Sequence, residues 1–468
     1  ARLMAEWPEV RHLPFSSERM LMAGFHRGDG GIVAFVKGAP RAVLDRCDRI
    51  ATDAGVRPLD AEERDALLDV NRNMAAHGLR VLALATGAVE RAAADELKGL
   101  TWVGLAGLSD PPAPGVPETI GAFRQAGIRT VMITGDHRLT AASIAGQLGL
   151  LGPDDEVLEG RDIERLSDAE LEEKVPHVGA FGRASPESKL RIIAALQRRG
   201  EIVAMLGDGV NDAAALRKAD IGVAMGGRGA DLAKEAADVI LEDDRFPTIG
   251  VAIEEGRVIL DNVRKFVFYL FSCNLAEILV LLGAGLAGYP TALAPLQILW
   301  LNLLTDTFPA LALAVEPAEP GIMRRPPPDP RAAILPAATV RSAVGYAALI
   351  ALATLASFAW GLRGGNPAVA TTLAFMTLAF AQILHLGNAR SAGPVLSPRR
   401  ALANPYAIGA VGLSVGLQLF AALFPPLSRV LRLTPLSAGD WTAVAVLALT
   451  PAVVGQAIKA VRRRAPRE

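Results

Sequence analysis

The sequence has little cysteine, since Cys47 and Cys273 are its only two among 468 residues. Two thiols so far apart suggest neither a disulfide framework nor a zinc site. The chain also lacks an excess of charge of one sign, because 48 Lys and Arg balance 49 Asp and Glu to a net charge of -1. No strongly basic face is expected, which argues against a nucleic-acid partner.

The first residues lack the apolar core of a targeting peptide. The stretch from Ala1 to Trp7 mixes charged and apolar residues. A secretory signal needs a continuous run of roughly 7–15 apolar residues, so no such signal is expected. The sequence instead begins as a chain already under way would begin.

Long hydrophobic runs fill the second half of the sequence, and 51% of all residues are hydrophobic. A helix needs roughly 20 apolar residues to cross a bilayer. A buried soluble bundle could imitate one or two such stretches, but six in succession favour membrane spans. We place the spans at about 262–287, 291–315, 337–360, 368–388, 405–424 and 440–460.

Short β-type runs alternate with helix-type segments before residue 250. The runs are 32–36, 81–84, 130–133 and 202–205, and one helix-type segment extends from Ser188 to Arg199. This alternation predicts parallel strands with helices on both faces. The expected fold class is therefore an α/β part followed by an all-α bundle of six transmembrane helices.

Positive charge between the predicted spans indicates their orientation. Arginine and lysine gather after the second, fourth and sixth spans, whereas the loop from Ala287 to Pro295 has none. Cytoplasmic connections carry such an excess, so the α/β part and the C-terminus are expected to face the cytoplasm. The high Ala, Gly and Arg content is compatible with an integral protein of a bacterial plasma membrane.

Asp208, Asn211 and Asp212 follow the apolar run from Ile202 to Leu206. A buried strand that ends in these residues presents oxygen atoms at the carboxyl edge of a sheet, where ligands of such folds bind. Mg²⁺ prefers a few carboxylates together with phosphate oxygens and water. The cluster predicts magnesium-dependent phosphate chemistry; the alternative is a capped turn with solvated acids.

Two further segments offer groups for a phosphate. The segment Thr134 to Asp136 lies between a predicted strand and a helix, where a hydroxyl and backbone N–H groups can hold phosphate; the alternative is a plain turn. Lys189 falls in the first turn of a helix opened by Ser185 as N-cap and Pro186. Since the helix dipole disfavours a cation there, Lys189 either shares a phosphate with the dipole or is a solvated surface lysine.

Polar residues interrupt the first two predicted spans. Asn274 and Glu277 share one helix face of the first span, and Asn302, Thr305 and Asp306 share one face of the second. A carboxylate in mid-membrane costs about 2.5–3.5 kcal/mol on insertion scales, so these faces should converge on a cation. Oxygen ligands favour a hard ion such as Ca²⁺, Mn²⁺, Mg²⁺ or Na⁺.

The alternative is that the polar residues only form contacts between helices, which suits Gln297 and Gln418 better. Cys273 is interpreted as a packing residue.

Four motifs in order, followed by six spans, resemble the P-type cation-transporting ATPases. The motifs are Lys37-Gly38-Ala39-Pro40, Asp110-Pro111-Pro112, Met132-Ile133-Thr134-Gly135-Asp136 and Gly207-Asp208-Gly209-Val210-Asn211-Asp212. The likeness covers essentially the whole chain. Six spans after the phosphorylation domain are typical of the calcium, sodium–potassium and proton pumps, whereas heavy-metal pumps have two.

The resemblance implies a role for each matching residue. Asp208 would bind Mg²⁺ with support from Asn211 and Asp212. Thr134, in its motif with Gly135, and Lys189 would hold the transferred phosphoryl group, while Asp110 and Asp136 would border the nucleotide.

The resemblance also implies an ATP site in the nucleotide-binding domain. Phe15 would stack on adenine, Lys37 and Gly38 would line the pocket, and Arg80 would reach the phosphates. Met20 departs from the lysine that the family commonly has, which puts nucleotide affinity at that corner in doubt.

The resemblance also implies parts that this sequence does not contain. The family's phosphorylated aspartate lies in Asp-Lys-Thr-Gly-Thr and its actuator domain carries Thr-Gly-Glu, and neither string occurs here. We expect the C-terminal portion of a pump, either a fragment or one half of a split protein, that needs an N-terminal portion to turn over ATP. The expected domains are 1–107 (part of the nucleotide-binding domain), 108–246 (a haloacid-dehalogenase-like Rossmann phosphorylation domain without its first strand) and 247–468 (stalk and six transmembrane helices).

The membrane motifs resemble the calcium-pump version of the family. The stretches from Asn274 to Glu277 and from Leu299 to Asp306 carry this similarity. The calcium-pump pattern has a further carboxylate where Gln382 stands here, which implies one Ca²⁺ per cycle. The expected function is ATP-driven Ca²⁺ export. Two alternatives stay open: a membrane-anchored haloacid-dehalogenase-type phosphatase, and a non-catalytic subunit or degenerate pump.

Overall fold

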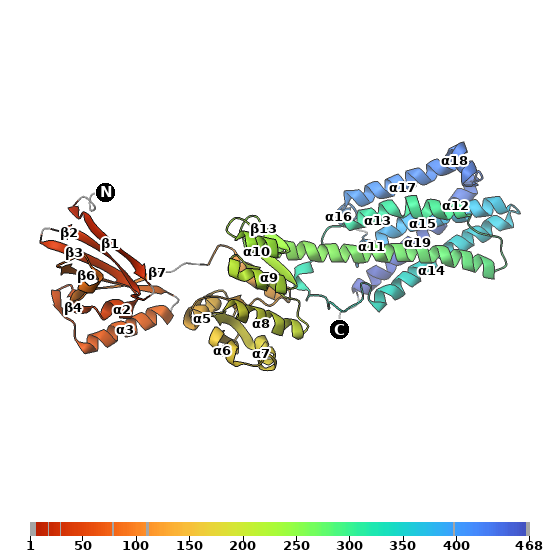
Figure 1. The fold of residues 1–468 in the computed structure, drawn as a ribbon. Helices are drawn as coiled ribbons and strands as arrows, with labels where there is room; N and C mark the ends of the chain where they lie inside the picture. The colour runs from red at the N-terminus through yellow and green to blue at the C-terminus, as the bar shows by residue number, and fades with distance from the viewer. Residues whose placement is uncertain are drawn as a thin grey trace. The chain divides into compact units, whose positions relative to one another are not determined.

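The computed structural model describes residues 6–16, 18–28, 30–76, 79–108, 112–395 and 398–464. The chain divides into two compact units, Ala1–Gly250 and Val251–Glu468 (Figure 1). This division confirms the change of character predicted near residue 250.

The N-terminal region forms a seven-stranded sheet with the order β1-β2-β3-β6-β7-β4-β5. Neighbouring strands are antiparallel except β4 and β7. The parallel arrangement predicted for runs 32–36 and 81–84 is therefore wrong, because successive strands such as β2 and β3 follow one another too closely for a crossover. The strands are β1 (Glu9–Ser16), β2 (Leu21–Gly28), β3 (Gly31–Gly38), β4 (Cys47–Thr52), β5 (Gly55–Pro58), β6 (Arg80–Val89) and β7 (Leu100–Leu108).

Helices α2 (Pro40–Leu44) and α3 (Ala61–Ala76) lie against one face of this sheet (Figure 1). That face carries the buried side chains of Leu21, Phe25 and Trp102. Phe35 and Leu84, which lie on alternate positions of their strands, are exposed. The alternation of buried and exposed residues is what a sheet covered on one side requires.

The second region of the same unit consists of two parallel three-stranded sheets, with orders β8-β10-β9 and β11-β12-β13. The parallel α/β arrangement is confirmed here, although β8 covers only two residues and β11 begins two residues later than expected. The strands are β8 (Met132–Ile133), β9 (Glu156–Glu159), β10 (Val178–Gly182), β11 (Ala204–Gly207), β12 (Ile221–Met225) and β13 (Val239–Leu241). The helices are α4 (Val116–Gln125), α5 (Arg138–Gln147), α6 (Gly160–Arg165), α7 (Asp168–Lys174), α8 (Pro186–Arg198), α9 (Ala213–Lys218) and α10 (Asp231–Ala236).

Among the residues that the structure describes, six helical segments are long and apolar enough to cross a bilayer, which confirms the predicted number. They are Pro247–Leu286, Pro295–Ala314, Ala337–Arg363, Pro367–Ala389, Pro405–Leu423 and Ala438–Val461. The first is the single helix α11, whose 40 residues correspond to about 60 Å. The others are built from α12 (Pro295–Trp300) with α13 (Thr307–Ala314), α14 (Ala337–Arg363), α15 (Pro367–Ala389), α17 (Pro405–Leu423) and α19 (Ala438–Arg464), with the short α16 (Pro398–Ala401) and α18 (Pro425–Val430) between them.

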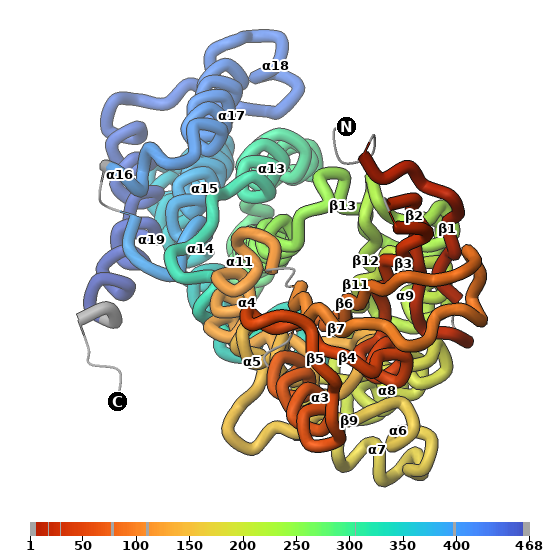
Figure 2. The backbone as a smooth tube through the Cα atoms, turned by 90° about the vertical axis from the view of Figure 1, so that its left-hand side faces the viewer, coloured from red at the N-terminus to blue at the C-terminus, as the bar shows by residue number. Residues whose placement is uncertain are grey.

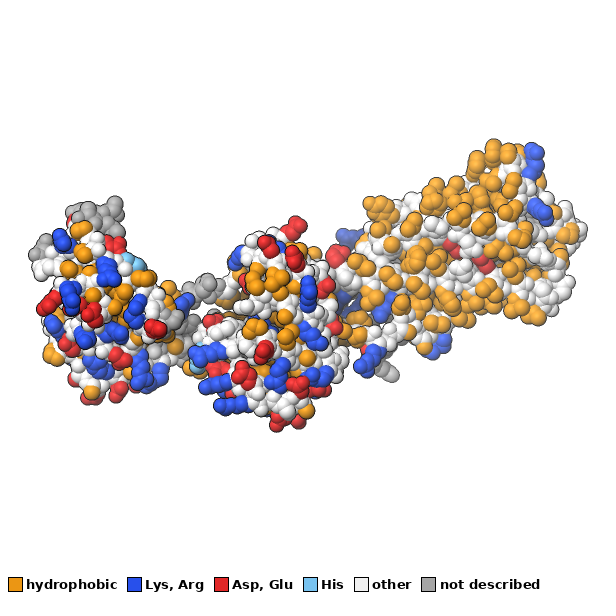
Figure 3. Space-filling model, in the orientation of Figure 1, with side chains coloured by type: hydrophobic (Ala, Val, Ile, Leu, Met, Phe, Trp, Pro, Cys, Tyr) orange, Lys and Arg blue, Asp and Glu red, His pale blue; other side chains and the backbone are white. Residues whose placement is uncertain are grey.

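The helical unit presents apolar side chains outward. Leu286, Leu352 and Leu423 are among its exposed hydrophobic residues, and Figure 3 shows hydrophobic side chains over most of this surface. An apolar exterior of this extent suits lipid rather than water. The chain is therefore an integral membrane protein. Helix α15 lies deepest and packs against α14, α17 and α19 (Figure 2).

The second span is not one regular helix. A π-helical turn, Leu301–Thr305, separates α12 from α13, and the Asp306 N–H donates to the Leu301 carbonyl five residues earlier. The sequence analysis used α-helical spacing to place Asn302, Thr305 and Asp306 on one face, so the π turn is a correction to that spacing. Single π turns inside helices frequently occur at functional sites.

Candidate functional site

Three predicted groups of the α/β part meet at the carboxyl ends of β8 and β11. Lys189 Nζ lies 2.5 Å from Asp212 Oδ1. The Ala184 N–H donates to the Thr134 carbonyl (3.2 Å), which ties the Thr134 loop to the start of α8. As predicted, Ser185 caps α8 by accepting from the Ser188 N–H (3.1 Å). Lys189 is thus a paired, largely buried side chain and not a solvated one.

Thr134 and Asp136 form a tight turn after β8. The Thr134 hydroxyl donates to Asp136 Oδ2 (3.0 Å), and the Asp136 N–H donates to that hydroxyl oxygen (3.1 Å). Gly135 and Asp136 are exposed, and helix α5 begins two residues later. The turn therefore leaves polar groups accessible at the sheet edge, as the phosphate prediction requires.

The side-chain oxygens after β11 fit as ligands of a magnesium ion. Asp208 and Asn211 are exposed, whereas Asp212 is buried and also accepts from the Gly209 N–H (3.2 Å). No cluster of three or more His, Cys, Asp or Glu side chains that could hold a metal occurs among the described residues. A small number of protein oxygens completed by phosphate and water is the pattern that Mg²⁺ prefers.

Glu159 supports this edge and was missed by the sequence analysis. Its carboxylate accepts from the Arg138 N–H (3.2 Å) and pairs with Arg161 (2.9 Å). The backbone N–H of Arg138, followed by the charge of Arg161, holds the pKa of Glu159 below its usual value. Since Arg138 starts α5, Glu159 fixes the segment that follows Asp136. No motif in the sequence signalled this contact.

The predicted nucleotide residues lie on the seven-stranded sheet. Phe15 on β1 is 57% exposed, and Lys37 on β3 and Arg80 at the start of β6 are also exposed. Gly38 is buried, and a Cβ atom there would lie 2.5 Å from the Met20 carbonyl oxygen, so this close approach requires glycine. Asp110 lies outside the described residues.

The centre of the helical unit holds a carboxylate bound by two amides. Glu277 on α11 is 4% exposed. Its Oε1 accepts from Gln382 Nε2 on α15 (3.1 Å), and its Oε2 accepts from Asn302 Nδ2 in the π turn (3.2 Å). Gln382 also donates to the Cys273 carbonyl (3.3 Å). Three segments far apart in sequence therefore converge on Glu277.

Asp306 completes the acidic part of this cluster. Its side chain is 2% exposed, and neither carboxylate oxygen has a hydrogen-bond partner among the described residues. A buried charged carboxylate without a partner is costly, and a bound cation or a proton on the carboxyl group would remove that cost. The side chain of Thr305 lies outside the described part of the chain.

Asn274 differs from the prediction that its side chain joins Glu277. Its amide donates to the Leu270 carbonyl of its own helix (2.9 Å), and the residue is exposed on α11. Cys273 is fully buried in the cluster that also contains Phe268 and Tyr269, and its role as a packing residue stays a prediction. Asn274 therefore remains a predicted ligand that the described contacts do not bring to the cluster.

Two buried ring side chains beside the cluster, Tyr269 and His385, were not predicted. The Tyr269 hydroxyl donates to the Gln382 carbonyl (3.2 Å). His385 is fully buried between Phe268, Tyr269 and Tyr346, and its ring nitrogens have no partner among the described residues. Their proximity depends on how α11 and α15 pack, which spacing along one helix does not indicate.

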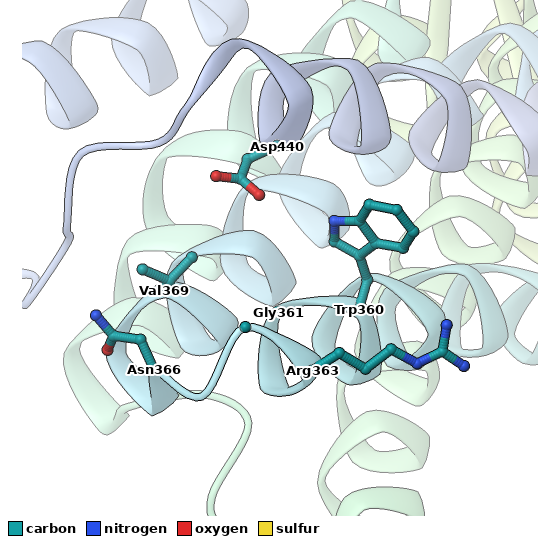
Figure 4. A pocket seen from close by; sticks show the side chains of 7 residues that line it. Trp360, Gly361, Arg363, Asn366, Val369 and Asp440 are labelled. Carbon is teal, nitrogen blue, oxygen red and sulfur yellow. The ribbon is translucent and has the colours of Figure 1, made fainter.

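Gln297 and Gln418 join helices, as predicted. Gln297 Nε2 donates to the Leu431 carbonyl (3.0 Å), and Gln418 Oε1 accepts from Trp300 Nε1 (3.0 Å). A pocket elsewhere, lined by Trp360, Arg363, Asn366 and Asp440 (Figure 4), contains none of the predicted residues. We assign it no part in the candidate site.

Comparisons with known proteins show to which family the chain belongs. Family models match residues 290–461 (cation transporting ATPase, C-terminus), 1–115 (P-type ATPase, cytoplasmic domain N) and 188–252 (haloacid dehalogenase-like hydrolase). The chain belongs to the P-type cation-transporting ATPases. The haloacid-dehalogenase-like match includes Lys189, Asp208 and Asp212, while the C-terminal match includes Asn302, Asp306 and Gln382.

Individual relatives of this P-type ATPase chain are similar over almost its whole length. Calcium-transporting ATPase 1 of Bacillus cereus is 37% identical over 97% of the chain, the calcium-transporting ATPase of Bacillus subtilis is 40% identical over 94%, and the human calcium-transporting ATPase type 2C member 1 is 37% identical over 98%. The matches cover 53%, 50% and 50% of these relatives. The chain thus spans about half the length of the curated relatives it matches.

Proposed function

We propose that this chain is the C-terminal portion of an ATP-driven pump that exports Ca²⁺ from the cytoplasm. The names of the calcium-transporting relatives support the choice of ion. The observation that carries the proposal is the Glu277 cluster, where two buried carboxylates and two amides meet inside an apolar bundle. An anchor of a soluble phosphatase has no need of such groups.

The transported cation would bind between α11, the π turn and α15. Glu277, Asp306 and Asn302 offer oxygen atoms, the ligands that hard cations prefer. Gln382 offers Oε1, which has no partner among the described residues. Asn274 and Thr305 complete the proposed set. Because Gln382 contributes no charge, the two carboxylates would balance one divalent ion.

The α/β part would supply the phosphate chemistry. When bound, Mg²⁺ would offset charge on the phosphoryl group. Asp208 and Asn211 would hold it, Thr134 would donate to phosphoryl oxygens, and Lys189, oriented by Asp212, would bring positive charge to the same edge. Phe15, Lys37, Gly38 and Arg80 would bind ATP on the seven-stranded sheet, and Asp110 and Asp136 would border it.

The nucleophile would come from the N-terminal portion of the pump. Within the described residues, β8 and β11 each pair with a strand on one side only. A further strand can therefore add to either edge, and its carboxyl end would lie beside Thr134 and Asp208. This supports domain limits of 1–107, 108–246 and 247–468, with the phosphorylation domain completed by a strand that carries the phosphorylated Asp.

The long helix α11 offers the mechanical connection. It runs without interruption from Pro247 to Leu286 and carries Glu277. Movement of its first half would change the position of Glu277 relative to Asn302 and Gln382. We place the α/β part in the cytoplasm and the helices in a bacterial plasma membrane, with Arg-rich connections inside.

The test is phosphorylation of the full-length protein by ATP. We expect a Ca²⁺-dependent acyl phosphate, and its loss in Asp208→Ala. Normal labelling of this variant would contradict the role of Asp208. A phosphatase would instead release phosphate from small monoesters without Ca²⁺, and a degenerate pump would do neither.

A further inference from the structure

A buried ion pair joins two helix ends outside the Glu277 cluster. Glu316 follows the end of α13, and Arg390 is the C-cap of α15. Arg390 Nε lies 3.1 Å from each carboxylate oxygen of Glu316. The two residues are 6% and 8% exposed. Such a pair is well shielded from water.

Two asparagines extend this pair to other helices. Asn404, the N-cap of α17, donates from Nδ2 to Glu316 Oε2 (2.7 Å) and to the Ala312 carbonyl (2.9 Å). Asn262 on α11 donates from Nδ2 to the Glu316 carbonyl (2.7 Å). Both are at most 3% exposed. We name Asn262, Glu316, Arg390 and Asn404 the helix-end clamp.

The clamp satisfies backbone groups that helix termini leave without partners. Asn404 binds the Ala312 carbonyl of α13, and Asn262 binds the Ala314 carbonyl at its end (3.3 Å). Arg390 donates to the carbonyls of Arg400 (3.2 Å) and Ala401 (3.0 Å) in α16. Each contact crosses from one helix to another. The clamp therefore fixes how far α11, α13, α15 and α17 are shifted along their axes relative to one another.

Overall stability alone does not explain a buried ion pair. The cost of removing both charges from water can equal or exceed their attraction, and apolar replacements are often neutral. The best-attested role of buried polar groups is to fix the register of neighbouring helices. The clamp has the geometry for this role, because its four members come from four different helices or helix ends, on α11, after α13, at the end of α15 and at the start of α17.

The helices that the clamp joins also carry the residues of the Glu277 cluster. Arg390 follows Gln382 by eight residues on α15, about 12 Å at 1.5 Å per residue. Glu277 lies about 22 Å along α11 from Asn262, and Asp306 directly precedes α13, whose end holds Glu316. Since helices are stiff and closely packed, an axial shift at the clamp is transmitted to the cluster.

We propose that Glu316, Arg390, Asn262 and Asn404 are positioning residues for the transported cation. They set the register at which Glu277, Asp306 and Gln382 face one another, without touching the ion. This inference rests on the proposed function.

The first test is Glu316→Gln in the full-length pump. The amide keeps the volume but removes the charge and turns a donor toward Arg390 or Asn404. We expect the Ca²⁺ concentration for half-maximal ATPase activity to rise about tenfold, with the maximal rate within about twofold of wild type. Gln456→Met is the matched control, because Gln456 joins α15 to α19 through Asn388 Oδ1 (2.8 Å), and α19 carries none of the proposed ligands. Its Ca²⁺ dependence should stay unchanged.

The double variant Glu316→Leu with Arg390→Met separates positioning from stability. It leaves no unpaired buried charge, so we expect a thermal midpoint closer to that of wild type than Glu316→Gln has, although the Arg400 and Ala401 carbonyls lose their donor. The Ca²⁺ requirement should nevertheless stay about tenfold higher. A Ca²⁺ dependence that recovers together with the thermal midpoint would overturn the clamp.

The outcomes also separate this inference from the proposed function. If the ATPase activity of the wild type does not depend on Ca²⁺, both the clamp and the proposed function are overturned. Ca²⁺-activated wild type, with no shift in Glu316→Gln or in the double variant, would overturn the clamp alone.

Discussion

Lys189 on α8 reaches across to Asp212 after β11, with Nζ 2.5 Å from Oδ1. Their side chains are 17% and 11% exposed, so water screens the pair only weakly. The contact orients the lysine despite its unfavourable place in the first turn of a helix. Each residue therefore depends on the other for its position at the proposed phosphoryl site.

Asp212→Asn should impair phosphorylation strongly. The amide keeps the shape but replaces a charge-assisted hydrogen bond with a neutral one, a loss of about 2 kcal/mol. That corresponds to about a 30-fold slower formation of the phosphoenzyme from ATP. Rapid-quench labelling of the full-length protein measures this rate.

Asp168→Asn is the control for that variant. Asp168, the first residue of α7, pairs with Arg191 on α8, the helix that carries Lys189, but the Asp168 side chain is 64% exposed. Exposed pairs contribute about 0–1 kcal/mol. Neither residue of this pair is a proposed ligand. Its labelling rate should match wild type. Equal loss in both variants would argue that Asp212 acts only through general stability.

Gln382→Ala should weaken Ca²⁺ activation. Removal of the amide deprives the Glu277 carboxylate of a donor at 3.1 Å. A hydrogen bond to a charged group contributes about 1.5–3 kcal/mol, so the Ca²⁺ concentration for half-maximal ATPase activity should rise roughly 10- to 100-fold. Gln418→Ala removes another fully buried glutamine, one that binds Trp300 instead. It should lower the thermal midpoint but leave Ca²⁺ activation within about twofold. If both variants shift the Ca²⁺ concentration for half-maximal activity to a similar extent, Gln382 is not a ligand in the cation site.

Cys47 should resist thiol reagents. The residue is 3% exposed, and burial raises the pKa of its thiol to about 12 from 9.0. The reactive thiolate is therefore scarce at pH 8. We expect maleimide to label Cys47 only after unfolding, whereas an Asp53→Cys variant at an exposed turn should react at once. Rapid native labelling of Cys47, followed by mass spectrometry, would contradict its burial.

The same shift predicts a direction for stability. The folded-state pKa of Cys47 lies above the unfolded value, so the unfolded chain loses this proton first as the pH rises. The contribution of the neutral thiol is complete below about pH 9 and is lost progressively toward pH 12. Replacement by Ala should flatten this part of the pH–stability curve, and an unchanged slope would contradict the shift.

The sequence predicted the parts of the fold that depend on local pattern. Apolar runs of bilayer length gave six spans, and Ser185 with Pro186 correctly marked the start of α8. The antiparallel order of the N-terminal sheet was missed, because strand-type runs do not reveal which strands pair. Periodicity also assumes regular helices, so the π turn at Leu301–Thr305 could not be anticipated.

The candidate sites divide in the same way. Glu277, Asp306 and Lys189 stood out because their charges are costly where the pattern places them. Glu159, His385 and the Glu316–Arg390 pair escaped notice, since each depends on a contact between segments distant in sequence. Charge in an apolar run is visible in a sequence, whereas its partner is a property of the packing.

Asp306→Asn should stabilise the pump without Ca²⁺ and remove its response to Ca²⁺. Both oxygens of the buried Asp306 carboxylate lack partners among the described residues, and a neutral amide costs less to bury. In chelator the thermal midpoint should therefore rise by a few degrees. Wild type should gain about 2.7 kcal/mol at a Ca²⁺ concentration of 100 times its dissociation constant, whereas the variant should gain none.

Glu277→Gln provides the matched comparison for Asp306→Asn. Glu277 already accepts from Asn302 and Gln382, so a glutamine would turn its NH₂ group toward one of these donors. This variant should lose the Ca²⁺ response and also melt below wild type in chelator. The opposite signs distinguish an unpartnered carboxylate from a satisfied one. If Asp306→Asn instead melts lower in chelator, or keeps the full Ca²⁺ shift, Asp306 is not a ligand of the transported cation.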